Sequence, residues 1–214
     1  MRSSLLSKSL ATAAVVAILA LNSSVASAQF VNPGFEDPIT FDGPPFVGSW
    51  EGFSGAGAFS VNGNQSPRSG ALHARLGIDN SVNTFAGVFQ DVAGLTPGAS
   101  VDFGGYHMTP SSPLNLGVEF RIEWRNSVSD TEVGRTPNST TAPGASYTLF
   151  NLTATVPANA DTARAVYAIQ SFTTNPLGNG EVYLDDMSFV IPEPASLGLL
   201  TAAGLFAARR RRSM

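Results

Sequence analysis

The sequence predicts an all-β domain, an antiparallel sandwich or barrel, between two short apolar segments at the ends of the chain. Three observations lead to this fold class. Apolar and charged residues alternate over residues 118–125, which is the period of a half-buried strand. Turn-forming residues, among them 21 glycines and 14 prolines, separate short apolar stretches. No stretch between the two ends keeps a helical period over three turns.

The clearest strand is the alternating one, with charges of both signs on one face and four apolar residues on the other: Val118, Phe120, Ile122 and Trp124. In chain order, the other expected strands are residues 58–61, 71–76, 85–92, 100–107, 147–156, 163–171 and 182–189. Residues 94–98 predict a turn, and the polar stretches 43–45, 52–57 and 126–145 predict surface loops.

The N-terminal 28 residues have the pattern of a signal peptide. Arg2 and Lys8 precede an apolar run over residues 10–21, which is too short to span a bilayer comfortably. Small residues, Ala26 and Ala28, then stand at the positions that a signal peptidase reads. Cleavage would leave residue 29 as the new N-terminus. The alternative is an N-terminal helix buried in the fold.

The C-terminal segment, residues 191–214, has three parts. A proline-rich start is followed by 14 apolar residues, 195–208, which make a helix of about 21 Å, short against a hydrocarbon core of about 30 Å. An arginine cluster comes next and would stay on the cytoplasmic side of the membrane. The sequence therefore predicts a short transmembrane helix that holds the preceding domain outside the cytoplasm.

This tail resembles the PEP-CTERM sorting signal of Gram-negative bacteria. The residues that carry the resemblance are Pro192, Glu193, Pro194, Arg209, Arg210, Arg211 and Arg212. The resemblance implies processing by an exosortase, and the family occurs in bacteria that make extracellular polysaccharide. We therefore expect a protein that is transiently anchored in the inner membrane and then reaches the cell envelope, the cell surface or the medium. The alternative is an ordinary tail anchor.

The charge of the remaining body, residues 29–190, excludes some classes of function. It holds six arginines, no lysine and fifteen acidic residues, which gives −9, whereas the whole chain carries −4. Nucleic-acid binding needs clustered basic residues, so we expect no nucleic-acid partner. The absence of cysteine from the sequence excludes disulfides and thiolate catalysis. An acidic body is compatible with cations and with neutral glycans.

Three phrases of the body, residues 30–36, 89–99 and 182–189, resemble the carbohydrate-binding-module jelly rolls of the galactose-binding-like class. The resemblance implies a jelly-roll sandwich whose first and last strands lie side by side and hold a structural calcium. By that match the calcium ligands are the carboxylates of Glu36 and Asp185 and a backbone oxygen of Asn32. Calcium prefers such oxygen ligands. The alternative is that both acids are exposed turn and strand-end residues.

Aromatic side chains are the candidates for sugar contacts, since a pyranose has an apolar face. The candidates are Trp50, Phe53, Tyr106 and Trp124. Trp124 shares its strand face with apolar residues and is expected in the core. Of the others, Trp50 and Tyr106 are the predicted ligand contacts.

A catalytic function is not expected. His73 and His107 lack metal-ligand spacing, no nucleophile elbow is present, and Glu119 and Glu123 flank an arginine in an ion-pair pattern typical of a solvated surface. The sequence favours a non-catalytic, exported cell-surface or matrix protein that associates with exopolysaccharide. The alternatives are a structural surface protein that contacts other proteins without binding sugar and, less favoured, a small hydrolase.

Overall fold

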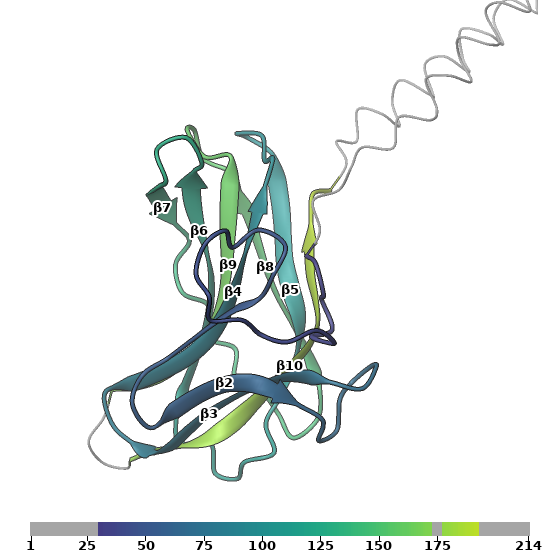
Figure 1. Ribbon diagram of the computed structural model, residues 1–214, viewed down its shortest axis with the longest axis vertical. Coiled ribbons are helices and arrows are strands. Elements are labelled where there is room, and N and C mark those ends of the chain that lie inside the picture. Colours follow the sequence, from purple (N-terminus) through teal and green to yellow (C-terminus); the bar gives the residue numbers. More distant parts are fainter. Residues whose placement is uncertain (1–29, 173–176, 193–214) are drawn as a thin grey trace, which may run out of the picture. The chain divides into compact units, whose positions relative to one another are not determined.

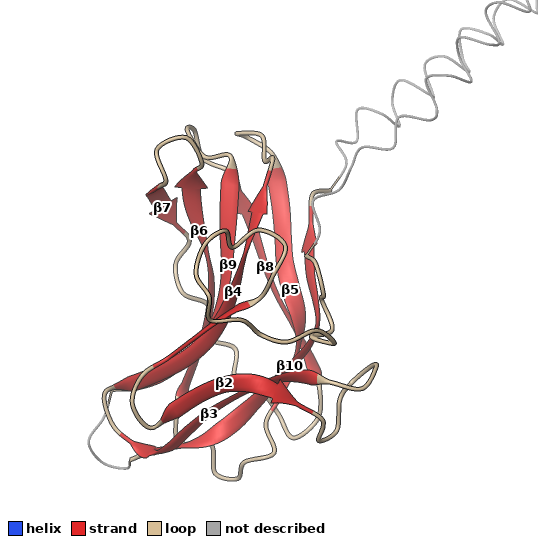
Figure 2. Cartoon of the chain, in the orientation of Figure 1, coloured by secondary structure: helices blue, strands red, loops and turns tan. Residues whose placement is uncertain are grey.

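A computed structural model of the chain describes residues 30–172 and 177–192. These residues form two antiparallel five-stranded sheets and no helix, as Figure 2 shows. The prediction of an all-β sandwich is therefore confirmed. None of the residues described could cross a membrane as a helix. The predicted signal helix, its cleavage site at Ala26 and Ala28, and the predicted transmembrane helix lie outside the described residues.

The first sheet, sheet A, has the strand order β1-β4-β9-β6-β7, and sheet B has the order β2-β3-β10-β5-β8. The strands of sheet A are β1 (Glu51–Ser54), β4 (Thr84–Ala93), β6 (Gly117–Asn126), β7 (Thr131–Arg135) and β9 (Thr162–Ser171). The strands of sheet B are β2 (Ala58–Gly63), β3 (His73–Ser81), β5 (Ser100–Met108), β8 (Thr148–Thr155) and β10 (Gly178–Val190). Figure 1 shows their arrangement.

The core lies between the two sheets and follows the period of two. On β6, Phe120 and Ile122 are buried, and they pair with Tyr167 and Ala165 of the central strand β9. Trp124 is 4% exposed, so its expected place in the core is confirmed. The inward-facing side chains of β3, β5 and β10 in sheet B pack into the same hydrophobic core. One side of each sheet therefore faces the core, and the other side is left for solvent or ligands.

Two edge strands were not expected from the sequence. β1 and β7 fall in stretches for which the sequence predicts loops. β1 has only four residues, and β7 is almost wholly exposed and polar. Their residues follow no apolar alternation. Hydrogen bonds to β4 and β6 hold them in the sheet instead.

The beginning of the described chain lies beside its end. The backbone N–H of Met187 in β10 donates to the carbonyl of Pro33 at 2.9 Å, and Figure 1 shows the two segments running together. The expected pairing of the first and last strands is not present, because residues 30–36 form no strand and the first strand, β1, lies in the other sheet from β10. The segment Ala28–Pro192 forms one compact unit with its own hydrophobic core. We therefore expect it to fold without the two ends of the chain.

Candidate functional site: the outer face of sheet A

Four phenylalanine rings form a row on the outer face of sheet A. The ring centroids of Phe46 and Phe89 are 4.9 Å apart, those of Phe89 and Phe53 are 6.1 Å apart, and those of Phe53 and Phe85 are 6.0 Å apart. Phe85 is 44% exposed, and the other three rings are half-buried. We call these four residues the aromatic row. It exposes a continuous apolar strip on an otherwise polar face.

A glycine in β4 makes room for the middle of the row. Phe85, Gly87 and Phe89 alternate along the outward side of β4, and Gly87 pairs with Phe53 of β1. A Cβ atom at Gly87 would stand 2.3 Å from Cζ of Phe53 and 2.5 Å from the carbonyl oxygen of Tyr167. Any larger residue would push the Phe53 ring away from the sheet. The close approach therefore needs glycine at this position.

A partly buried ion pair borders the aromatic row. The guanidinium of Arg164 in β9 donates to both carboxylate oxygens of Asp91, at 2.7 and 3.0 Å. Its Cζ atom lies 4.6 Å from the ring centre of Phe46 and 4.3 Å from that of Phe89. The bidentate pair and the two rings fix the guanidinium in one position. The hydrogen-bond donors of Arg164 and the hydrogen-bond acceptors of Asp91 are therefore held in a fixed orientation directly beside the aromatic row.

A second ion-pair cluster occupies the other half of the face. Arg121 in β6 donates to Glu119 at 2.5 Å and to Glu123 at 2.9 Å. The predicted ion-pair pattern is confirmed, but the prediction that this face is solvated is wrong. Glu119 and Glu123 are only 7% and 8% exposed. The side-chain amides of Asn138 and Gln170 donate to Glu119 as well and close over its carboxylate.

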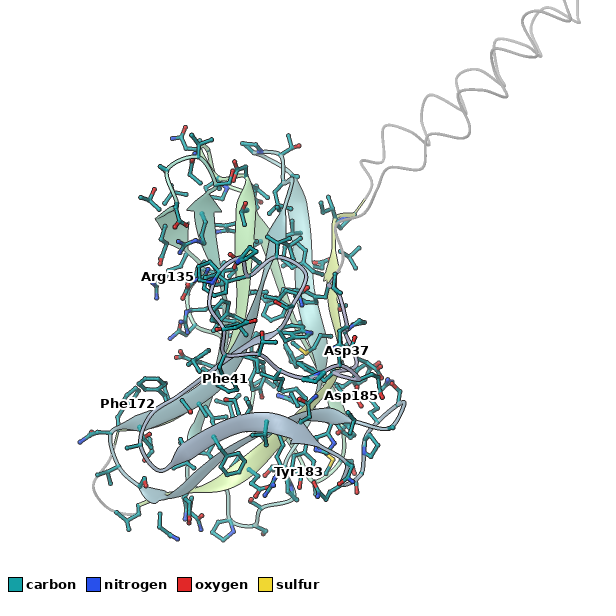
Figure 3. The ribbon with its side chains drawn as sticks, in the orientation of Figure 1. Asp37, Phe41, Arg135, Phe172, Tyr183 and Asp185 are labelled. Carbon is teal, nitrogen blue, oxygen red and sulfur yellow. The ribbon has the colours of Figure 1, made fainter. Side chains whose placement is uncertain are left out.

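The face as a whole suits a ligand with alternating apolar and hydroxyl-bearing surfaces. The aromatic row offers flat apolar area, and the Arg164–Asp91 pair offers both donors and acceptors. Two further exposed rings, Phe41 at 58% and Phe172 at 64%, are labelled in Figure 3. A sugar chain has this chemistry: each ring presents C–H groups on one side and hydroxyls at its edge. Pockets and clefts for such ligands combine apolar area with a few placed polar groups.

Trp50 is a core residue, which corrects its assignment as a ligand contact. Its side chain is 1% exposed, and its ring lies 4.7 Å from that of Phe30 and 4.8 Å from that of Phe35. The indole N–H donates to the carbonyl oxygen of Asn32 at 2.8 Å. Its glycine-rich neighbourhood in the sequence predicts exposure, but the N-terminal segment folds over the indole and covers it.

Tyr106 lies on the outer face of sheet B, apart from the aromatic row and from Trp50. The guanidinium carbon of Arg68 lies 3.4 Å from the centre of its ring, and the side chain is half-buried. Arg68 therefore covers one side of the ring that a sugar would need. The structure does not bring the two predicted ligand contacts, Trp50 and Tyr106, together.

The two predicted calcium-binding carboxylates do approach one another. Asp185 of β10 is fully buried, and its carboxylate accepts from the backbone N–H groups of Arg68 and Ser69, at 2.8 and 3.1 Å. Glu36 accepts from the N–H of Ala71 at 3.0 Å in the same loop. A Cβ atom on Gly34 would lie 3.6 Å from an oxygen of Asp185 and 3.9 Å from an oxygen of Glu36.

The third predicted ligand, the carbonyl oxygen of Asn32, faces another way. It accepts from the indole of Trp50 and from the backbone N–H of Phe35 at 3.1 Å. Within residues 30–172 and 177–192, no three acidic, histidine or cysteine side chains come together as a metal cluster. Burial raises the pKa of Asp185, and the negative charge of the adjacent Asp186 acts in the same direction. The carboxylates of Asp185 and Glu36 are of the ligand type that calcium prefers, but backbone N–H groups of Arg68 and Asp186 already donate to the two oxygens of Asp185.

Comparison with solved structures places the fold. The xylan-binding domain CBM22-1 of Paenibacillus barcinonensis Xyn10C matches with a TM-score of 0.53 and 12% identity, over 81% of this chain and all of that one. TmCBM61, solved with β-1,4-galactotriose, matches with a TM-score of 0.50 and 12% identity, over 75% of this chain and 96% of that one. The enzymatically active domain of tailspike protein 4 of bacteriophage CBA120 matches with a TM-score of 0.54 and 14% identity. That match spans 67% of this chain but only 19% of the tailspike.

These similarities define the class of the domain: it has the jelly-roll β-sandwich fold of carbohydrate-binding modules. No curated protein matches the chain. Residues 190–212 match the PEP-CTERM protein-sorting motif. This motif marks the chain as an exported surface protein and implies processing by an exosortase.

Proposed function

We propose that the sandwich of this exported protein is a non-catalytic module that binds a chain of extracellular polysaccharide along the outer face of sheet A. The observation that carries the proposal is the aromatic row beside the fixed Arg164–Asp91 pair. Both features lie on one exposed sheet face, so several sugar rings of one chain could contact it together. The names of two similar structures support the ligand class, since one is a xylan-binding domain and the other holds a galactotriose.

The placement of the histidines supports a binding role over a catalytic one. His73 and His107 are both fully buried, and neither lies on the outer face of sheet A. Three carboxylates on that face, those of Asp91, Glu119 and Glu123, are held in ion pairs with Arg121 and Arg164. A general acid or base needs a proton-exchanging group within reach of the substrate. The ion-paired acids are better suited to orienting hydroxyl groups.

Replacement of Phe53 by alanine is expected to weaken polysaccharide binding by at least about tenfold, because it removes the centre of the aromatic row. Calorimetry on residues 29–192 with the host's own exopolysaccharide, xylohexaose and β-1,4-galactotriose would measure the loss. Leu149→Ala is the control, since Leu149 is 60% exposed on the outer face of sheet B. Equal binding by both variants would refute the site, and no binding by the folded, unmutated domain would favour a protein-contact role.

We also propose that calcium binds between Glu36 and Asp185 and stabilises the sandwich where its first and last segments meet. Two observations support this: the Asp185 carboxylate is fully buried, and both acids point toward Gly34. Figure 3 labels Asp185 and the neighbouring Asp37 on the same side of the molecule. The cation would offset the buried negative charge and tie the N-terminal segment to β10.

Calcium at about one hundred times its dissociation constant is expected to stabilise the folded domain by about 2–3 kcal/mol. Thermal unfolding with calcium and with chelator would measure this. Glu36→Ala should abolish the difference, whereas Asp37→Ala should keep it, since the Asp37 carboxylate has no hydrogen-bond partner among the described residues. The effect should fade as the pH falls through the raised pKa of Asp185, because only the ionised carboxylate binds calcium. An identical melting temperature with calcium and with chelator would exclude the site.

A further inference from the structure

A polar pocket of about 490 Å³ lies on the opposite side of the sandwich from the aromatic row. Its floor is the outer face of sheet B, where Arg75 of β3 and Glu181 of β10 stand side by side. Its wall is the segment that follows β5, with Ser111 and Asn115. Volumes of this size hold small organic ligands in other proteins.

The wall of the pocket is fastened to β10 by hydrogen bonds. The hydroxyl of Thr109 donates to the carbonyl oxygen of Glu181 at 2.7 Å, and the N–H of Glu181 donates to the hydroxyl of Ser111 at 2.9 Å. The backbones of Asn115 and Asn179 exchange two further bonds, at 3.0 and 3.2 Å. Because these bonds do not involve a ligand, the pocket is formed in advance, which lowers the entropic cost of binding.

One aromatic ring forms part of the lining. The tip of the Phe59 ring lies over Gly77, where a Cβ atom would be only 2.1 Å from Cζ of the ring. This repeats the arrangement of Phe53 over Gly87 on the other sheet. The guanidinium carbon of Arg75 lies 4.9 Å from the centre of the Phe59 ring. The ring is half-buried and gives the pocket an apolar wall beside its polar groups.

The charges of the pocket favour a neutral ligand rich in hydroxyl groups. Arg75 donates from Nε to Glu181 at 2.7 Å and forms a second bond to the same carboxylate, so that the pair is held ionised and in one geometry. Asp79 adds a further negative charge, which leaves the three groups at −1 and opposes anions. Hydroxyls can donate to the two carboxylates and accept from the guanidinium, and the C–H side of a sugar ring can pack on Phe59.

We propose that this pocket is a second sugar site, which binds one or two neutral sugar residues at a chain end, and that the domain is thereby bivalent. The bivalency depends on the proposed function of sheet A, but the pocket itself does not. Since the two sites lie on opposite faces of one sandwich, one molecule would join two polysaccharide chains. Such a protein cross-links a matrix in addition to adhering to it.

NMR titration of residues 29–192 with the methyl β-glycosides of xylose, glucose and galactose, and with xylohexaose, tests the pocket. At least one neutral glycoside is expected to shift the backbone signals of Arg75, Asp79 and Asn115 in a saturable way. Phe59→Ala should weaken this binding at least about tenfold, and Phe53→Ala should leave it unchanged. Asp79→Asn provides a second variant at an exposed position, in case Phe59→Ala disturbs the fold.

The outcomes separate the two proposals. If the backbone signals of the pocket residues shift and Phe53→Ala weakens the binding of no ligand, the pocket proposal is supported and the proposed site on sheet A is refuted. If only the aromatic row responds, the pocket proposal is overturned. Methyl β-glucuronide, which is negatively charged, is titrated for comparison. If it binds more tightly than the neutral methyl β-glucoside, the claim that the pocket opposes anions is contradicted. For bivalency, light scattering with the host's exopolysaccharide should show aggregation by the unmutated domain and none by Phe53→Ala or Phe59→Ala.

Discussion

Replacement of Trp50 by alanine is expected to lower the free energy of unfolding of the sandwich by about 3–5 kcal/mol. The indole is 1% exposed and packs between Phe30 and Phe35. Its removal leaves a cavity and takes the indole N–H donor from the carbonyl oxygen of Asn32. Urea unfolding of residues 29–192, followed by circular dichroism, would measure the change. Since domains of this kind are stable by only about 5–15 kcal/mol, the variant should be close to unfolding.

Two other variants show whether the loss comes from the core. Trp50→Phe keeps an aromatic ring in place and should lose about half as much, mainly through the missing hydrogen bond and the smaller volume. Phe85→Ala removes a ring that is 44% exposed and should cost less than about 1 kcal/mol. A Trp50→Ala domain that stays fully stable but no longer binds sugar would contradict its place in the core and restore it as a ligand contact.

Acidification from pH 7 to pH 4 is expected to destabilise the domain through His107. This side chain is fully buried, its Nδ1 lies 2.8 Å from the hydroxyl of Tyr167, and its Nε2 has no partner among the described residues. Burial lowers its pKa to about 4, whereas the pKa of the unfolded chain is about 6.5. Between these values the unfolded state binds a proton that the folded state does not. Stability is therefore full above pH 6.5 and falls as the pH drops toward 4.

The expected loss in the free energy of unfolding between pH 7 and pH 4 is about 2–3 kcal/mol. His73 acts in the same direction, because burial lowers its pKa as well, and Asp185 acts in the opposite direction. The urea midpoint measured at each pH gives the total effect, and His107→Gln isolates one part of it. Glutamine stays neutral over this range and can still form a hydrogen bond with the hydroxyl of Tyr167, so the variant should lose less stability in acid. A pH profile that is the same with and without the substitution would refute the assignment to His107.

The sequence predicts the sandwich because the strands of its core alternate. Val118 to Trp124 reveal their common face directly, since each second side chain points inward. The edge strand β7 follows no such rule. It buries no side chain, and only its hydrogen bonds to β6 define it, so no apolar pattern marks it in the sequence.

The sites could be predicted only in part. The family resemblance predicts Glu36 and Asp185, and the structure brings them near one another through the contact of the N-terminal segment with β10. The aromatic row is not among the sites that the sequence predicts, although Phe85, Gly87 and Phe89 alternate on one strand and give a local signal. The prediction that Trp50 contacts a ligand is wrong, because the exposure of a residue depends on which distant segment covers it. A phenylalanine opposite a cross-strand glycine, as Phe53 is to Gly87, lies on the outer face of its sheet with its ring half-buried.

The most direct test of the proposed glycan site is a crystal structure of residues 29–192 with the oligosaccharide that binds tightest in calorimetry. The account predicts electron density for consecutive sugar rings along the aromatic row, over Phe53 and Phe89, with hydroxyl groups within hydrogen-bond distance of Arg164 and Asp91. Density for the ligand elsewhere, with the aromatic row left free, would contradict the claim that the outer face of sheet A binds the polysaccharide.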